Sequence, residues 1–164
     1  MKGLNGRTGA VVAIDPTTGA ILALASSPSI DPNLLSSHDS ADITAEYEKL
    51  MGNPDQPMLN RPIAMTLPPG SVFKLVTAAA ALESGNFTAD SVLPGPKEFP
   101  LPLTDKTLGN WNEKACSPTD ELTLAEALAV SCNTAFAWLG LQLGPEKLLE
   151  QSEKFGFGTE FDIP

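Results

Sequence analysis

The sequence predicts an α+β fold in which an N-terminal β-hairpin precedes a mostly helical subdomain. Apolar, β-branched runs flank a turn that contains Pro and Gly within residues 9–25, and apolar segments with helix start and stop signals follow residue 70. The chain has 164 residues, of which 42% are hydrophobic and 18% charged. This composition is typical of a globular domain with a core of its own.

The predicted hairpin turns at residues 15–19, between two strands. Both strands are apolar with little alternation, so we expect both faces to be covered, as in the middle of a layered sheet. Because two strands alone are marginally stable, we expect further strands of the natural protein beyond residue 164. Residues 26–40 predict a surface loop, and residues 41–51 predict a short amphipathic helix.

A central helix is predicted from Ser71, directly after the Pro- and Gly-containing turn at residues 68–70, to a stop at Gly85. Its sides are apolar nearly all round, which predicts a buried helix. Residues 86–120 contain many Pro, Gly and Asn and predict short strands and loops.

Three more helices are predicted over residues 123–130, 134–143 and 146–155. The first opens with a capping-box pattern formed by Thr123 and Glu126. The last two are separated by Gly144, which is a typical helix stop.

The net charge of −10 argues against several classes of partner. An acidic chain repels phosphate backbones and anionic lipid surfaces, so we expect no nucleic-acid partner. No apolar run approaches the roughly 20 residues of a membrane-spanning helix, and the N-terminal residues lack the apolar region of a signal peptide. With one histidine and two cysteines, the sequence predicts no metal site and no cofactor.

Ser71 and Lys74 are candidates for a nucleophile and its base. At a helix start, positions i and i+3 lie on one face, one turn apart. A serine hydroxyl needs a base, and a lysine amine serves as one when burial in apolar surroundings lowers its pKa. The alternative is a capping serine followed by a surface lysine. The tight turn before Ser71 and the apolar helix after it favour catalysis.

Ser131 and Asn133 lie two positions apart in the turn between two predicted helices. Both side chains can point the same way there, so that the hydroxyl can relay a proton and the amide can hold a carbonyl group or a lysine. Taken alone, this pair is better explained as residues that cap and turn the chain.

In combination, these residues resemble the penicilloyl-serine transferase family, and within it the transpeptidase domain of penicillin-binding proteins. That family carries Ser-x-x-Lys and then Ser-x-Asn, and here Ser131 follows Ser71 by 60 positions. Residues 9–26 resemble the opening hairpin of these domains, and residues 59–61 and 68–74 resemble their approach to the nucleophile. The resemblance covers essentially the whole chain.

The resemblance implies a role for each candidate residue. Ser71 would be the serine that is acylated, Lys74 its general base, Ser131 the proton relay toward the leaving amine, and Asn133 the residue that holds the substrate amide. The implied activity is that of a class B D,D-transpeptidase, which cross-links peptidoglycan stem peptides through an acyl-serine and is acylated by β-lactam antibiotics. The implied location is the extracytoplasmic face of the bacterial cell membrane, where other cell-wall synthesis proteins are expected partners.

One motif of the family is missing. No Lys-Thr-Gly follows Asn133, and the Lys-Thr-Leu at residues 106–108 lacks the glycine and precedes Ser131. Residues 1–164 are therefore expected to be a single partial transpeptidase domain, truncated before the Lys-Thr-Gly strand. The expected fold is the helical subdomain and N-terminal hairpin of a β-lactamase/transpeptidase-like fold, with the remaining sheet strands missing.

Such a truncated domain is expected to be a poor catalyst or inactive as it stands. Two alternatives stay open for its function. One is a non-catalytic interaction fragment of the same fold, and the other is a serine β-lactamase or a β-lactam sensor.

The resemblance also gives meaning to the two cysteines. Because the family acts outside the cytoplasmic membrane, where disulfides persist, we hypothesise a Cys116–Cys132 bond that tethers the turn at Ser131. The residues themselves leave two buried free thiols open. Trp111, on a loop before Ser131, is expected either to line the cleft or to pack against the core or its own loop.

Overall fold

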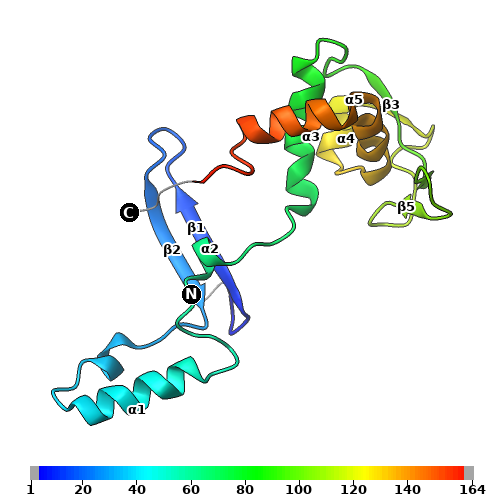
Figure 1. The fold of residues 1–164 in the computed structure, drawn as a ribbon. Helices are drawn as coiled ribbons and strands as arrows, with labels where there is room; N and C mark the ends of the chain where they lie inside the picture. Colours follow the sequence, from blue (N-terminus) through cyan, green and yellow to red (C-terminus); the bar gives the residue numbers. More distant parts are fainter. Residues whose placement is uncertain (1–3, 161–164) are drawn as a thin grey trace. The chain divides into compact units, whose positions relative to one another are not determined.

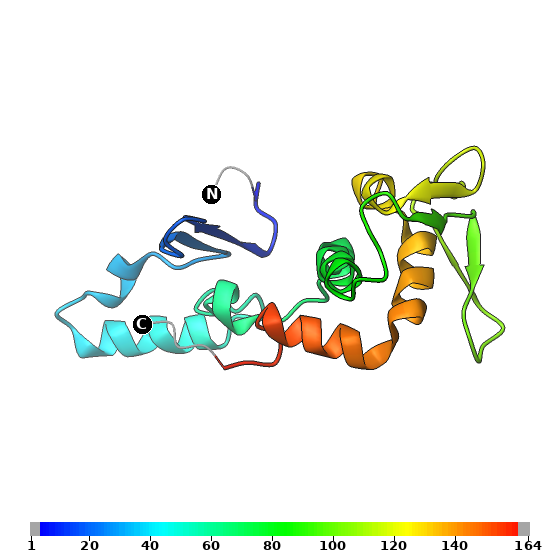
Figure 2. The same cartoon turned by 90° about the horizontal axis from the view of Figure 1, so that it is seen from above.

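The structure is a computed structural model that describes residues 4–160. The chain divides into two compact units, one ending at Pro68 and the other beginning at Pro69. Figure 1 shows the helices and strands along the chain, and Figure 2 shows the same cartoon from above. Among the described residues, no helix is both long enough and apolar enough to cross a membrane.

The first unit opens with the predicted hairpin, in which strand β1 (Gly9–Ile14) pairs antiparallel with β2 (Ile21–Ser27). The side chain of Asp15 closes the turn. It accepts hydrogen bonds from the Thr17 N–H at 2.9 Å and from the Thr18 hydroxyl at 2.8 Å. A short polar side chain therefore fixes the reversal of the chain, as is common in turns. The hairpin prediction is confirmed.

The faces of this hairpin are more exposed than predicted. Within the described part of the chain, 48% of the Val11 surface and 70% of the Leu22 surface remain accessible to solvent. The expectation of two covered faces is therefore wrong for these residues. An apolar pattern shows that a strand has side chains suited to burial. Whether another segment covers them depends on the tertiary structure.

The rest of the first unit contains three helical segments, η1 (Pro32–Leu35), α1 (Ser40–Met51) and α2 (Arg61–Ala64). Asp39 caps α1 by accepting a hydrogen bond from the Ala41 N–H at 2.8 Å. The Arg61 side chain is buried and donates to backbone carbonyls, including that of Gln56 at 3.1 Å. The predicted loop and amphipathic helix are confirmed, and η1 adds one short turn within the loop.

The second unit is mostly helical and contains η2 (Gly70–Val72), α3 (Phe73–Glu83), α4 (Leu124–Ala129) and α5 (Asn133–Lys154). Its short strands form two antiparallel pairs, β3 (Val92–Pro94) with β6 (Glu121–Thr123) and β4 (Glu98–Pro100) with β5 (Thr107–Gly109). The predicted capping box opens α4, because Thr123 and Glu126 each accept a hydrogen bond from the other's N–H. Short strands and a capped helix were both predicted from the sequence and are confirmed.

The core of the second unit lies where α3 packs against α5. Small side chains on α3 let the two helices approach closely, and Ala81 and Leu139 are fully buried between them. Other parts of α3 are exposed, because 51% of the Leu75 surface and 48% of the Leu82 surface remain accessible within the described residues. The prediction of burial all round this helix is therefore wrong at these two positions.

A sharp change of backbone direction divides α5. Gly144 has φ 78° and ψ 168°, a conformation that only glycine adopts readily, and Pro145 follows it inside the helix. The two helices predicted on either side of Gly144 are therefore two segments of this one element.

Candidate active site

Ser71 and Lys74 lie one turn apart at the beginning of α3. Gly70, with φ 56°, leads the chain into the short turn η2, which continues directly into the helix. The spacing brings Lys74 Nζ to 3.3 Å from Ser71 Oγ. Ser71 is exposed, whereas Lys74 is buried with 9% of its surface accessible. An accessible hydroxyl thus lies beside a sheltered amine.

Ser131 lies at the end of α4 in a left-handed backbone conformation, with φ 56°. The Ser131 N–H donates to the Leu128 carbonyl at 3.1 Å and the Cys132 N–H donates to the Ala127 carbonyl at 2.9 Å, which is the Schellman pattern of a helix end. This conformation aims two oxygens of Ser131 at the same amine. Lys74 Nζ lies 2.6 Å from the Ser131 carbonyl oxygen and 3.0 Å from Ser131 Oγ.

Asn133 is the first residue of α5. Its Oδ1 accepts a hydrogen bond from Lys74 Nζ at 2.6 Å, while its Nδ2 donates to the Gly109 carbonyl at 3.1 Å. A carbonyl oxygen can only accept, so the Gly109 contact fixes which end of the amide faces Lys74. The structure therefore brings all four predicted site residues together around one amine.

The surroundings of Lys74 favour its neutral form. Burial lowers the pKa of Lys74 from its ordinary value of 10.5, because the charged amine loses water that apolar neighbours do not replace. One of these neighbours is the buried ring of Phe136, whose centroid lies 5.9 Å from Nζ. A lysine with a lowered pKa beside a serine hydroxyl is one arrangement that can activate a serine nucleophile.

Two hollows adjoin these residues. One has a volume of about 330 Å³ and is lined by Gly70, Ser71, Lys74, Leu108, Asn133 and Ala137. The other has a volume of about 450 Å³ and is lined by residues that include Ser131 and Trp111, of which Trp111 is 78% exposed. Trp111 therefore does not pack in the core, and it lines the hollow that adjoins Ser131 rather than the one that contains Ser71.

The two cysteines form the hypothesised disulfide between Cys116 and Cys132, with Cα atoms 5.9 Å apart. Cys132 is 1% exposed and lies between Ser131 and Asn133 in sequence, so the bond ties the turn that carries both residues to the segment before β6.

One residue of the site was not predicted. Asn110 is 8% exposed, and its Oδ1 accepts a hydrogen bond from the Asn133 N–H at 3.0 Å. Asn110 directly precedes Trp111 in the segment for which the sequence predicts only short strands and loops. Its place in a turn-rich segment is the one feature of the sequence that could have drawn attention to Asn110. No local pattern predicts a hydrogen-bond partner 23 positions further along the chain.

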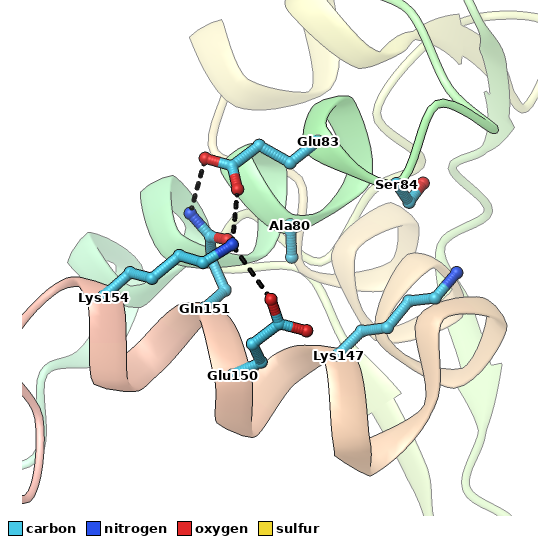
Figure 3. Close-up of a pocket in the computed structure, with 7 residues that line it drawn as sticks. All are labelled: Ala80, Glu83, Ser84, Lys147, Glu150, Gln151 and Lys154. Atoms are coloured by element: carbon cyan, nitrogen blue, oxygen red, sulfur yellow. Dashed lines mark hydrogen bonds and ion pairs between the residues drawn. The ribbon is translucent and has the colours of Figure 1, made fainter.

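A further hollow lies at the opposite end of α3, and Figure 3 shows its lining. The Glu83 carboxylate accepts hydrogen bonds from Gln151 at 3.2 Å and from Lys154 at 2.9 Å. The Ser84 hydroxyl donates to the Ala81 carbonyl at 2.7 Å, so it does not face a base. We interpret these contacts as a clamp that holds the end of α3 on α5, which leaves the beginning of α3 as the candidate catalytic end.

Comparison with known proteins agrees with this geometry. Residues 9–164 match the model of the penicillin binding protein transpeptidase domain. The chain is 47% identical over 151 residues to the peptidoglycan D,D-transpeptidase PbpA of Mycolicibacterium smegmatis, covering 92% of this chain and 30% of that protein.

Solved structures show the same fold. Penicillin-binding protein A from M. tuberculosis, in a ceftriaxone acyl-enzyme complex, superposes with a TM-score of 0.88 at 43% identity, over 93% of this chain and 34% of that one. Penicillin-binding protein PBP2 from Helicobacter pylori, in a complex with MreC, superposes with a TM-score of 0.81 at 26% identity, over 96% of this chain and 28% of that one.

The fold and the grouping of Ser71, Lys74, Ser131 and Asn133 thus agree with the family match. The chain belongs to the penicillin-binding protein transpeptidase family. It spans about a third of the length of the relatives it matches. The predicted family and the α+β, transpeptidase-like fold class are confirmed.

Proposed function

We propose that this protein is a class B D,D-transpeptidase that cross-links peptidoglycan stem peptides through an acyl-serine intermediate on Ser71. The convergence of the Lys74 amine on Ser71, Ser131 and Asn133 carries the proposal. A relative that is named a peptidoglycan D,D-transpeptidase and another that was solved as a β-lactam acyl-enzyme support it.

The contacts of Lys74 support its role as the base. Four oxygens surround Nζ, and two of them, the Ser131 carbonyl and Asn133 Oδ1, can only accept hydrogen bonds. A neutral amine has two N–H groups and one lone pair. When the N–H groups are directed at these two acceptors, the lone pair is directed toward the hydroxyls of Ser71 and Ser131. The site thus orients the neutral amine for proton abstraction.

The first chemical step is acylation. Ser71 Oγ attacks the carbonyl carbon of the penultimate D-Ala, and its proton passes to Lys74 Nζ, 3.3 Å away. The C–N bond to the terminal D-Ala then breaks. The leaving nitrogen takes a proton from Lys74 by way of the Ser131 hydroxyl, which lies 3.0 Å from Nζ.

In the second step, the amine of a neighbouring stem peptide attacks the acyl-serine carbonyl. Its proton returns through the same pair of groups, and Ser71 is released. We assign Asn133 to hold the amide of the substrate, because its side chain lines the hollow that also contains Ser71. A β-lactam ring would react with Ser71 in the same way but leave the acyl group in place.

The proposed setting follows from the substrate. Peptidoglycan stem peptides are cross-linked outside the cytoplasm, so we propose that this domain acts on the extracytoplasmic side of the cell membrane. The relative from Helicobacter pylori that was solved with MreC supports a protein partner for this chain as well. The disulfide between Cys116 and Cys132 is consistent with an oxidising compartment.

Acylation by benzylpenicillin tests the proposal. The full natural protein is incubated with the antibiotic, and the intact mass and the mapped peptides are measured. We expect a stable penicilloyl adduct on the peptide that contains Ser71. Substituting Ser71→Ala should abolish it, and Lys74→Met should slow its formation by about 10²-fold to 10⁴-fold, the usual contribution of a positioned base.

A serine at the other end of the same helix provides the matched control. Ser84→Ala removes a hydroxyl that donates to the Ala81 carbonyl and accepts from the Asn86 N–H, at the far end of α3 from Ser71, and it should leave the adduct unchanged. Rapid release of hydrolysed antibiotic would instead indicate the β-lactamase alternative. If the wild-type protein neither forms an adduct nor hydrolyses the antibiotic, Ser71 is not a penicillin-reactive serine and the proposal is contradicted.

A further inference from the structure

Asn110 directly follows β5 and is one of the few buried polar side chains of the second unit, with 8% of its surface exposed. Both ends of its amide are engaged. Because a buried polar group without partners is costly, the pattern of these contacts shows what Asn110 holds together.

The oxygen of Asn110 lies at the N-terminus of α5. Oδ1 accepts from the Asn133 N–H at 3.0 Å and from the Thr134 N–H at 3.2 Å, which are the first two N–H groups of the helix. Such groups have no partner within the helix and are normally satisfied by the N-cap residue. The N-cap of α5 is Cys132, which provides no side-chain hydrogen bond, so Asn110 supplies the cap from another part of the chain.

The nitrogen of Asn110 anchors this cap. Nδ2 donates to the Pro96 carbonyl at 3.0 Å and to the Lys114 carbonyl at 2.8 Å. Thr134, which is fully buried, adds a bond from its hydroxyl to the same Pro96 carbonyl at 2.8 Å. The capping side chain of Asn110 is therefore held in place by backbone carbonyls of two loop segments.

Asn133 is held at three points as a result. Its N–H bonds Asn110 Oδ1, its Nδ2 bonds the Gly109 carbonyl at 3.1 Å, and its Oδ1 bonds Lys74 Nζ at 2.6 Å. Two consecutive residues at the end of β5 thus fix both the backbone and the side-chain orientation of Asn133.

From these contacts we infer that Asn110 is a positioning residue for the acyl-transfer reaction: by capping α5 from outside, it holds Asn133 against Lys74. This inference rests on the proposed function of Ser71 and Lys74. Asn110 itself touches neither of these two side chains among the described contacts, so it acts through Asn133. Loss of the cap should let the first turn of α5 shift, and displacement of a reactive constellation by about 1 Å can cost a factor of about 10².

Two substitutions separate the two ends of the amide. Asn110→Ala removes both, and should lower the second-order rate constant of Ser71 acylation by benzylpenicillin about 10-fold to 100-fold. Asn110→Asp keeps the oxygen that caps α5, where negative charge is favoured, but loses the two bonds that Nδ2 donates, so it should slow acylation less than Asn110→Ala does. If both variants lose acylation equally while remaining folded, the cap is not what matters and the inference is overturned.

A second arm tests whether the effect passes through Asn133. Asn110→Ala should slow acylation in the wild-type background but add less than about twofold in an Asn133→Ala background, because residues that act as one unit are not additive. An equal slowing in both backgrounds would overturn the inference. Gln151→Ala is the matched control, since it removes another buried amide, which bonds Glu83, and should leave the acylation rate unchanged.

The wild-type measurement keeps the two proposals apart. If the wild-type protein is not acylated at Ser71, the proposed function fails before any variant is compared. Thermal unfolding identifies a variant that does not fold. Should Asn110→Ala be one, Asn110→Asp decides alone: a folded Asp variant that has lost acylation overturns the inference, and one that retains it supports the inference.

Discussion

At the scale of single residues, the site depends on the partial removal of water from the Lys74 amine. Its amine is buried beside Phe136, and burial lowers its pKa from 10.5. The oxygens around it are uncharged, and neutral acceptors offset the loss of hydration of an ammonium less well than a carboxylate would. A carboxylate here would raise the pKa of Lys74 and keep the amine protonated.

The rate of acylation at Ser71 should therefore rise with pH. Only the neutral amine accepts the serine proton, and its fraction grows as the pH rises through the lowered pKa of Lys74. We expect the second-order rate constant for benzylpenicillin to reach half of its plateau below pH 10.5. A Lys74→Met variant should show no such inflection. A midpoint at or above pH 10.5 in the wild type would contradict a base sheltered by burial.

Ser131 occupies a backbone position where glycine is the usual residue. It is the left-handed residue that ends α4, and a residue with a Cβ pays about 1–2 kcal/mol in that conformation. Its carbonyl and hydroxyl both reach Lys74 from there. A serine in this position is explained by the chemistry of the site rather than by the stability of the helix end.

Two substitutions at Ser131 should separate stability from reactivity. Both Ser131→Gly and Ser131→Ala remove the hydroxyl, and each should slow acylation by about 100-fold or more. The glycine variant relieves the backbone strain, so its free energy of unfolding should exceed that of the alanine variant by about 1–2 kcal/mol. Urea unfolding of the two variants measures this difference. Equal stabilities would mean that the left-handed conformation carries no strain.

The sequence was sufficient to predict the contact between Ser71 and Lys74, because the i, i+3 spacing at a helix start determines it locally. It was not sufficient to predict Asn110, whose partners in α5 are distant in sequence. The left-handed conformation of Ser131 was also not predictable, since nothing in its residue type favours that conformation.

At the scale of elements, α5 carries both the site and the core. Its first segment begins at Asn133 and contributes Leu139 to the core, while its second segment holds the end of α3 through Gln151 and Lys154. Gly144 lets one element serve both tasks, because it redirects the chain between them. If the helix continued straight through Gly144, its second segment would point in another direction and could not make these contacts with the end of α3.

Two glycines on α5 should respond in opposite directions to the same substitution. Gly144→Ala forces a Cβ into a backbone region that is essentially reserved for glycine, and should lower the free energy of unfolding by about 1–3 kcal/mol. Gly140 is helical, and a Cβ there would meet Leu148 at an ordinary 3.8 Å. Gly140→Ala should therefore raise the free energy of unfolding by up to about 1 kcal/mol. Chemical denaturation measures both, and a stabilising Gly144→Ala would contradict the assigned kink.

Element boundaries were predictable where a local signal marks them. The capping box at Thr123 opens α4, and Gly144 separates the two segments of α5, as the sequence predicted. The short pairing of β3 with β6 was not predictable in register, since three-residue strands carry too little pattern to choose a partner.

At the scale of the whole molecule, local patterns leave burial undetermined. The apolar strands of the hairpin predicted covered faces, yet Leu22 remains 70% exposed within the described residues. The chain divides into two compact units at Pro68 and Pro69, and the expectation of one partial domain over residues 1–164 stays a prediction. The Cys116–Cys132 pairing was predictable only because the family resemblance supplied the compartment.

Removing the cross-link should destabilise the second unit. The disulfide closes a loop of 16 positions, and a loop of about this length contributes about 3 kcal/mol, largely by restricting the unfolded chain. We expect the Cys116→Ala, Cys132→Ala double variant to lose about that much free energy of unfolding. A thiol reductant should lower the stability of the wild type by a similar amount but leave the double variant unchanged, which separates the cross-link from the packing of Cys132 in the core. A wild type that unfolds at the same urea concentration with and without reductant would show that the bond adds no stability.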